Sequence, residues 1–85
     1  MNQLENDIRR VFAEVWAFEK GSEAPALMPD TILLETGLDS LGFAIFVSSL
    51  DEALGYDPFT LSEDAFYPQT FAEFVAFYER YRPQT

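Results

Sequence analysis

The sequence predicts an all-α fold, a small helical bundle of three main helices plus one short helix, with a long loop between helices one and two. Three segments place apolar residues at the spacing of one helix face. Glycine or proline follows each of these segments, and no stretch alternates between apolar and polar residues as a strand does. The 85 residues, of which 48% are hydrophobic, suffice for one core, so residues 1–85 are expected to form a single domain.

The first helix is expected over residues 3–19. Its buried face would be formed by Leu4, Ile8, Val11, Phe12, Val15 and then Phe18 or Glu19. Trp16 lies beside this stripe, at the expected edge of the core. Gly21 is expected to end the helix, because glycine adopts the left-handed conformation that a helix C-terminus often needs.

Residues 21–39 are expected to form a long loop that contains two prolines and two glycines. Five apolar side chains in it can pack onto the core: Leu27, Met28, Ile32, Leu33 and Leu34. Asp30 is placed to start a single helical turn around residues 32–35, and Gly37 supplies a tight bend. A loop of this length in a small domain is usually functional or carries local structure.

The second helix is expected over residues 40–54 and is ended by Gly55 and Pro58. On a helical wheel the inward face carries Phe43, Val47, Leu50 and Leu54, with Phe46 beside them. The opposite face carries Leu41, Ile45, Ser48 and Glu52. Leu41 and Ile45 would then form a small exposed docking patch, unless the fold buries this helix on both sides.

Two capping boxes are expected in the remaining part of the chain. Thr60 and Glu63 have the spacing of one that leads into a turn over residues 64–67, which Pro68 ends. Thr70 and Glu73 form a second, which opens a last helix from Phe71 to about Tyr81. The inner stripe of this helix would comprise Phe71, Phe74, Val75, Tyr78 and Tyr81, and Pro83 ends it.

Histidine and cysteine are both absent from the chain. Without them, a Ser–His or Cys–His nucleophile pair and a zinc site built on imidazole or thiolate are excluded. No nucleophile elbow, EF-hand loop or phosphate-binding loop is present either. The sequence therefore predicts no catalytic residue and no metal site, and a chain that is not an enzyme acting alone.

The net charge is −10, and residues 21–79 contain no lysine or arginine. Such a surface repels nucleic acid and attracts proteins with basic patches, although acidity alone also keeps a small protein soluble. No apolar run reaches the roughly 18 residues that would cross a bilayer, and the N-terminus does not read as a signal peptide. The chain is therefore expected to be a cytoplasmic monomer without membrane insertion.

The segment Gly37-Leu38-Asp39-Ser40-Leu41 resembles the attachment motif of acyl and peptidyl carrier proteins. The resemblance covers nearly the whole chain. It extends to the long first loop, to the segment from Leu50 to Gly55 that closes the second helix, and to Pro68-Gln69-Thr70-Phe71 at the start of the last helix.

This resemblance implies that Ser40 carries 4′-phosphopantetheine, which a phosphopantetheinyl transferase installs from coenzyme A. The terminal thiol of the arm would hold acyl intermediates as thioesters and present them to acyl-loading, condensing or acyltransferase enzymes with basic docking surfaces. Gly37, Asp39 and Leu41 support the motif. The expected docking residues are Leu41, Ile45, Ser48, Asp51 and Glu52.

Two departures from the family pattern favour a specialised lipid or secondary-metabolite carrier. Gly42 and Ile45 stand where carriers of fatty acid synthesis usually have acidic residues on the outer face of helix two. The core would also be rich in phenylalanine, with Phe12, Phe18, Phe43, Phe46, Phe66, Phe71, Phe74 and Phe77 as candidates for burial. Bulky rings leave less space for a long acyl chain, so a short or amino acid-derived cargo is the hypothesis.

Three alternatives stay open at this point. They are a peptidyl or aminoacyl carrier, an acidic helical adaptor in which Ser40 is only a helix cap, and a small enzyme that depends on carboxylates. Either Ser40 or Asp39 has the right side chain to cap the second helix, which contributes about 1 kcal/mol. A cap at Asp39 would leave Ser40 free to point outward.

Overall fold

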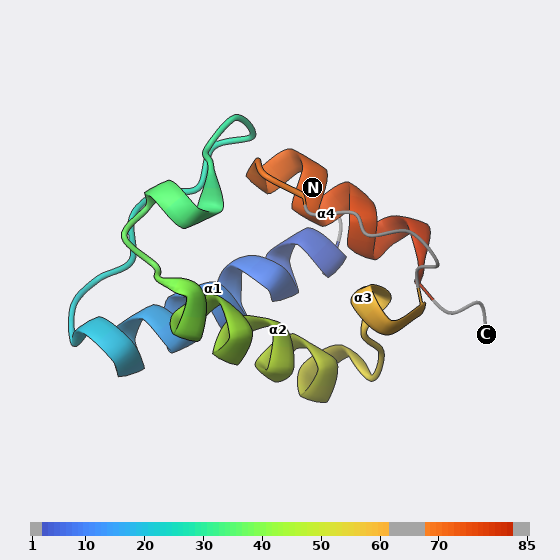
Figure 1. Cartoon of the computed structure of the whole chain (residues 1–85), viewed down its shortest axis with the longest axis horizontal. Helices are drawn as coiled ribbons and strands as arrows, with labels where there is room; N and C mark the ends of the chain where they lie inside the picture. The colour runs from blue at the N-terminus through green and yellow to red at the C-terminus, as the bar shows by residue number, and fades with distance from the viewer. Residues whose placement is uncertain (1–2, 62–67, 83–85) are drawn as a thin grey trace.

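The computed structural model describes residues 3–61 and 68–82. It contains α1 (Gln3–Lys20), the short 3-10 helix η1 (Leu33–Glu35), α2 (Ser40–Leu54), α3 (Pro58–Leu61) and α4 (Phe71–Arg80), as Figure 1 shows. No strand occurs among these residues, apart from an isolated bridge between Ile32 and Thr70. The predicted all-α class is confirmed, and the bounds of the three main helices agree with the prediction to within one residue.

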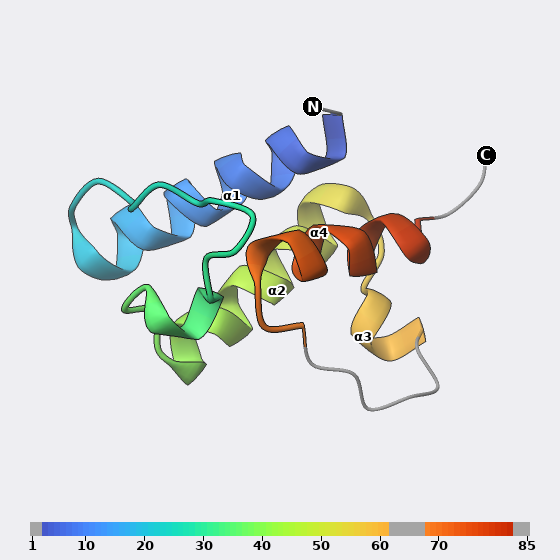
Figure 2. The same cartoon turned by 90° about the horizontal axis from the view of Figure 1, so that it is seen from above.

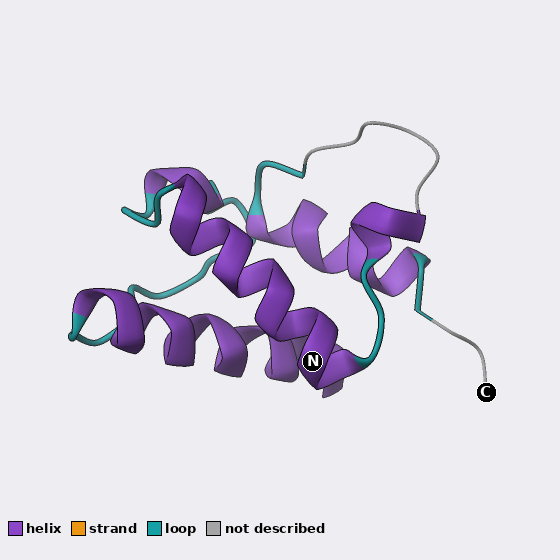
Figure 3. Ribbon diagram, turned by 60° about the horizontal axis from the view of Figure 1, so that its bottom comes forward, coloured by secondary structure: helices purple, strands orange, loops and turns teal. Residues whose placement is uncertain are grey.

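Helix α1 packs against both α2 and α4 (Figures 2 and 3). Its predicted stripe is buried through Leu4, Ile8, Val11, Phe12, Val15 and Trp16. The predicted continuation at Phe18 is wrong, because this side chain is 83% exposed. The last turn of α1 projects beyond the start of α2 (Figures 1 and 3).

The loop over residues 21–39 is attached to the start of α4 by backbone hydrogen bonds. The N–H of Leu33 donates to the Gln69 carbonyl at 3.1 Å, and the N–H of Phe71 donates to the Thr31 carbonyl at 2.8 Å. The pairing includes an isolated bridge between Ile32 and Thr70, just before η1. Leu33, whose N–H takes part in it, is buried, whereas Ile32 and Leu34 are exposed.

The expectations for this loop are therefore confirmed only in part. Leu27 and Leu33 are buried as predicted, but Met28, Ile32 and Leu34 do not pack into the core. The helical turn exists over Leu33–Glu35, yet Asp30 does not start it. Ile32 occupies the N-cap position of η1 without a side-chain hydrogen bond.

Helix α3 begins at Pro58, earlier than the turn predicted in this region. The Asp57 carboxylate accepts a hydrogen bond from the Phe59 N–H at 2.9 Å. Thr60 lies inside the helix, and its hydroxyl donates to the Asp57 carbonyl at 2.8 Å. Its proposed partner Glu63 and the turn over residues 64–67 lie outside the described residues.

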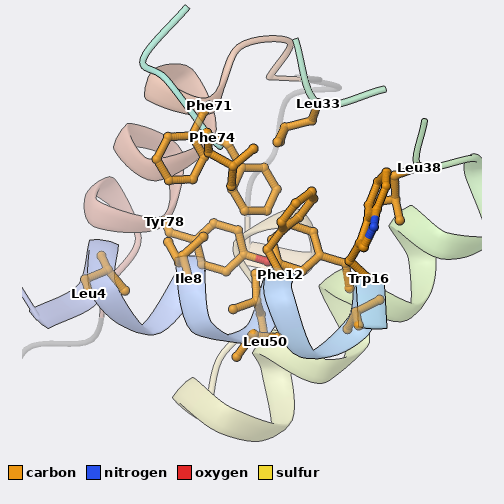
Figure 4. Packing of buried hydrophobic residues seen from close by; sticks show 14 of the residues in the cluster. Leu4, Ile8, Phe12, Trp16, Leu33, Leu38, Leu50, Phe71, Phe74 and Tyr78 are labelled. Atoms are coloured by element: carbon orange, nitrogen blue, oxygen red, sulfur yellow. The ribbon is translucent and has the colours of Figure 1, made fainter. Parts of the chain in front are cut away.

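Aromatic rings fill the space between α1, α2 and α4 (Figure 4). The ring of Phe46 lies 5.4 Å from that of Phe12 and 5.2 Å from that of Phe74, measured between centroids. Of the eight phenylalanines expected in the core, five are buried: Phe12, Phe46, Phe71, Phe74 and Phe77. Phe43 is half-buried, and Phe66 lies outside the described residues.

A tyrosine pair joins the segment after α2 to α4. The Tyr56 hydroxyl donates to the backbone carbonyl of Tyr78 at 2.7 Å, and both side chains are buried. Burial is the main reason why the pKa of each hydroxyl is raised, with the carboxylate of Asp57 adding to the effect at Tyr78. Both groups therefore stay neutral well into the alkaline range.

The predicted capping box at Thr70 is confirmed and makes stability depend on pH. Both members of the reciprocal pair are present: the Thr70 hydroxyl accepts from the Glu73 N–H at 3.1 Å, and the Glu73 carboxylate accepts from the Thr70 N–H at 3.0 Å. The N–H groups of Thr70 and then Gln69 lower the pKa of Glu73 below its usual value of 4.5. A depressed pKa in the folded state stabilises the protein above pH 4.5, and this contribution is lost as pH falls through the folded-state value.

We expect Glu73→Gln to make the free energy of unfolding depend less on pH in the acidic range. Glutamine keeps an acceptor for the N–H groups but does not titrate, so its stability deficit relative to the wild type should shrink below pH 4.5. Thermal unfolding of both proteins between neutral and acidic pH checks this, since the other carboxylates affect both equally. A deficit that stays constant across the range would contradict it.

Candidate functional site

Ser40 is the first residue of α2, and the residue before it caps the helix. The Asp39 carboxylate accepts a hydrogen bond from the Gly42 N–H at 2.8 Å, and its backbone carbonyl accepts from the Phe43 N–H at 2.8 Å. Of the two possible caps, the structure therefore shows Asp39. The Ser40 side chain is exposed and makes no hydrogen bond within the described part of the chain.

Leu38 and Asp39 both fold back onto Gly42. Leu38 is buried, and a Cβ atom placed on Gly42 would lie 2.7 Å from its Cδ1 atom and 3.2 Å from the Asp39 carboxylate. Only a glycine leaves room for both neighbours in this first turn. Leu38 is the buried member of this segment, whereas Asp39, Ser40 and Leu41 are exposed, Leu41 to 67%.

The loop that leads to Ser40 is held by local contacts. The Thr36 hydroxyl donates to the Leu33 carbonyl at 2.6 Å and accepts from the Leu38 N–H at 3.4 Å. Gly37 has a φ of 112°, a conformation that favours glycine, and lies against the indole ring of Trp16. The bend predicted at Gly37 is therefore present.

The start of α2 suits a negatively charged substituent on Ser40. The N–H groups of Ser40 and Leu41 have no acceptor among the described residues. Free N–H groups and the helix dipole both favour an anion at this end. The chain has no histidine or cysteine beside the hydroxyl, and the neighbouring Asp39 carboxylate accepts a hydrogen bond from the Gly42 N–H.

The predicted docking residues do not form one surface. Leu41, Ser48, Asp51 and Glu52 are exposed, but Ile45 is half-buried and packs against the core, so its assignment to an outer patch is wrong. Ser48 and Asp51 line a groove of about 390 Å³ next to Asp57 and Phe59. Ile45 and Glu52 instead line a groove of about 410 Å³ between α2 and α1.

The cause of this error is a rotation of the buried face. Its centre is Gly42, Phe46 and Leu50, spaced four residues apart, rather than Phe43 and Val47, which are half-buried. A glycine adds no apolar side chain to the pattern, so the sequence concealed the first member of the stripe. Gly42 is buried and Ile45 is half-buried, so neither is fully exposed. The comparison of these two residues with acidic docking residues of fatty acid carriers stays a prediction.

Gly42→Ala is expected to destabilise the protein although alanine is the better helix former. Alanine gains up to about 1 kcal/mol over glycine in a helix, but displacing buried side chains costs about 1–3 kcal/mol. Urea unfolding of Gly42→Ala should show the loss, and Leu38→Ala in the same chain should reduce it because the clash is removed. Ser48→Ala, at an exposed position of the same helix, is the matched control and should be neutral or slightly stabilising.

Searches against protein-family models, curated proteins and solved structures return no match for this chain. Among the described helices, none is both long enough and apolar enough to cross a bilayer. The described residues also contain no group of three or more carboxylates that could bind a metal ion. The function is therefore argued from the geometry around Ser40.

Proposed function

We propose that the chain is a carrier protein whose Ser40 is the attachment point for 4′-phosphopantetheine. The observation that carries this proposal is that Asp39 and Ser40 have different roles at the start of α2. Asp39 caps the helix, while Ser40 stands exposed beside it with an unused hydroxyl. A serine that only capped the helix would be directed at the backbone instead.

The residues around Ser40 fit the group. Attachment forms an ester between the Ser40 oxygen and a phosphate, which leaves one negative charge next to the free N–H groups of Ser40 and Leu41. The exposed position leaves room for a long substituent. When bound, the arm supplies a terminal thiol through which an acyl group is carried as an activated thioester.

The partners of such a carrier are a phosphopantetheinyl transferase and enzymes that load, condense or transfer acyl groups. The charge of −10 and the absence of basic residues over 21–79 favour partners with basic docking surfaces. Ser48 and Asp51 line the groove next to Phe59 of α3, and Glu52 lines the groove between α1 and α2. A partner that approaches Ser40 along α2 would meet acidic groups on either side.

A short or amino acid-derived cargo agrees best with the packing. Phe46 occupies the middle of the bundle, between the rings of Phe12 and Phe74, and is fully buried. A long acyl chain would have to displace these rings, and displacing well-packed core side chains costs energy. A structure of the loaded protein with a long chain between the helices would refute this part of the proposal.

The test uses the intact chain, coenzyme A and a broad-specificity phosphopantetheinyl transferase. Intact mass should increase by one phosphopantetheine group, and fragmentation should place the group on Ser40. If several transferases give no increase, the carrier proposal fails and the acidic adaptor becomes the better account. Loading with acyl and aminoacyl donors would then separate an acyl carrier from an aminoacyl one.

A further inference from the structure

Trp16, on α1, contacts both ends of the loop over residues 21–39. Its indole Nε1–H donates to the Ser22 hydroxyl at 3.3 Å, at the beginning of the loop. At the other end, a Cβ atom placed on Gly37 would lie 3.1 Å from the Cη2 atom of the same ring. Trp16 is itself buried, with the ring of Phe12 at 5.9 Å and the Lys20 ammonium at 5.8 Å.

These contacts connect Trp16 to Ser40 through a short piece of backbone. Gly37 precedes Leu38, whose buried side chain rests against Gly42 in the first turn of α2 (Figure 4 shows Trp16 extending toward the segment that carries Leu38). The indole ring thus lies close to one end of the backbone from Gly37 to Gly42, and Leu38 and Asp39 lie against the other end. Ser40 lies between these two contacts.

We propose that Trp16 is a positioning residue, which holds the Ser40 hydroxyl where a transferase can reach it. This inference rests on the proposed function. In the reaction, the Ser40 oxygen bonds to the phosphorus that carries pantetheine, and the pyrophosphate bond of coenzyme A breaks. The hydroxyl proton passes to a base of the transferase, and adenosine 3′,5′-bisphosphate leaves. Trp16 touches none of these atoms and acts only through Gly37.

Kinetics of modification distinguish positioning from a general loss of stability. For a transferase the carrier is a substrate. Partial unfolding lowers the concentration of folded carrier, which raises the apparent KM and leaves kcat unchanged. A folded carrier with a misplaced hydroxyl binds normally but reacts more slowly. Since small displacements of a reacting group lower rates by one to two orders of magnitude, we expect Trp16→Phe to lower kcat about tenfold with KM unchanged.

Two further variants serve as controls. Val11→Ala shortens another buried side chain of α1, one that lines the groove with α2 and is not part of the loop contacts. It should lower the denaturation midpoint but keep the wild-type kcat. Ser22→Ala removes only the indole hydrogen bond and keeps the ring against Gly37, so its kcat should stay within about twofold of the wild type.

Amide hydrogen exchange of the unmodified proteins gives a readout that needs no transferase. Trp16→Phe should accelerate exchange in the segment 36–41 relative to Val11→Ala. If the wild type is modified and Trp16→Phe has the same kcat, or if Val11→Ala loses as much kcat, the inference is overturned and the carrier proposal stands. If the wild type gains no mass at all, the carrier proposal is refuted and the inference falls with it.

Discussion

Ser40→Ala is expected to abolish modification by coenzyme A and a phosphopantetheinyl transferase. Alanine lacks the oxygen that would bond to phosphorus, so no mass increase should appear even at long incubation. The fold should survive, because the cap of α2 is supplied by Asp39 and the Ser40 hydroxyl makes no hydrogen bond within the described residues. Intact mass and circular dichroism, measured on the same preparation, check both parts.

The matched control is Ser48→Ala, which removes an exposed hydroxyl from the same helix eight residues later. This variant should be modified at the wild-type rate, because Ser48 lies in the interior of α2, away from its free N–H groups. A mass increase that persists in Ser40→Ala would show that another serine is used. Ser48 and Ser49 would be examined next, together with Ser62, which lies outside the described residues.

The sequence predicted the helices well because each has both a periodic apolar face and a local signal at its ends. Thr70 and Glu73 mark the start of α4 through hydrogen bonds between near neighbours, which a sequence can reveal. The burial of side chains in the loop over residues 21–39 was harder to predict. Leu33 is attached to the start of α4 by a hydrogen bond to Gln69, which is distant in sequence, so no local pattern predicts which leucine is buried.

The candidate site was likewise predicted in its local features and missed in its long-range contacts. Ser40 was chosen through the motif resemblance of residues 37–41, the bend at Gly37 was predicted from the glycine itself, and the cap at Asp39 was one of two options. The contacts of Trp16 with Gly37 and of Leu38 with Gly42 were missed, because they arise from the fold or from the space a glycine leaves empty. The one available signal was the glycine itself, since a glycine inside a helix is unfavourable unless close packing requires it.

The dependence on long-range packing also explains why Ile45 was assigned to an exposed docking patch. A helical wheel identifies which residues share a face, but only the position of α1 decides that Ile45 and Ser49 turn toward it. The outward residues next to Ser40 are therefore fewer than predicted. Leu41 remains as the exposed apolar neighbour, and acidic groups begin at Asp51, three turns further along α2.

Phe46→Ala is expected to have the largest effect on stability. Phe46 is fully buried and packs against the rings of Phe12 and Phe74, so truncation leaves a cavity where three helices meet. Removing a buried phenylalanine costs about 3–5 kcal/mol. Because a small domain has a total stability of about 5–15 kcal/mol, the variant should be largely destabilised or partly unfolded at 25 °C.

Phe18→Ala provides the matched control, since the same atoms are removed from a side chain that is 83% exposed. Its free energy of unfolding should stay within about 0.5 kcal/mol of the wild type. Urea unfolding of the two variants compares identical chemistry at a buried and an exposed position. Equal losses of stability would mean that the Phe18 ring is covered in solution. Phe18 lines the groove between α1 and α2, so the simplest cover would be another molecule bound in that groove.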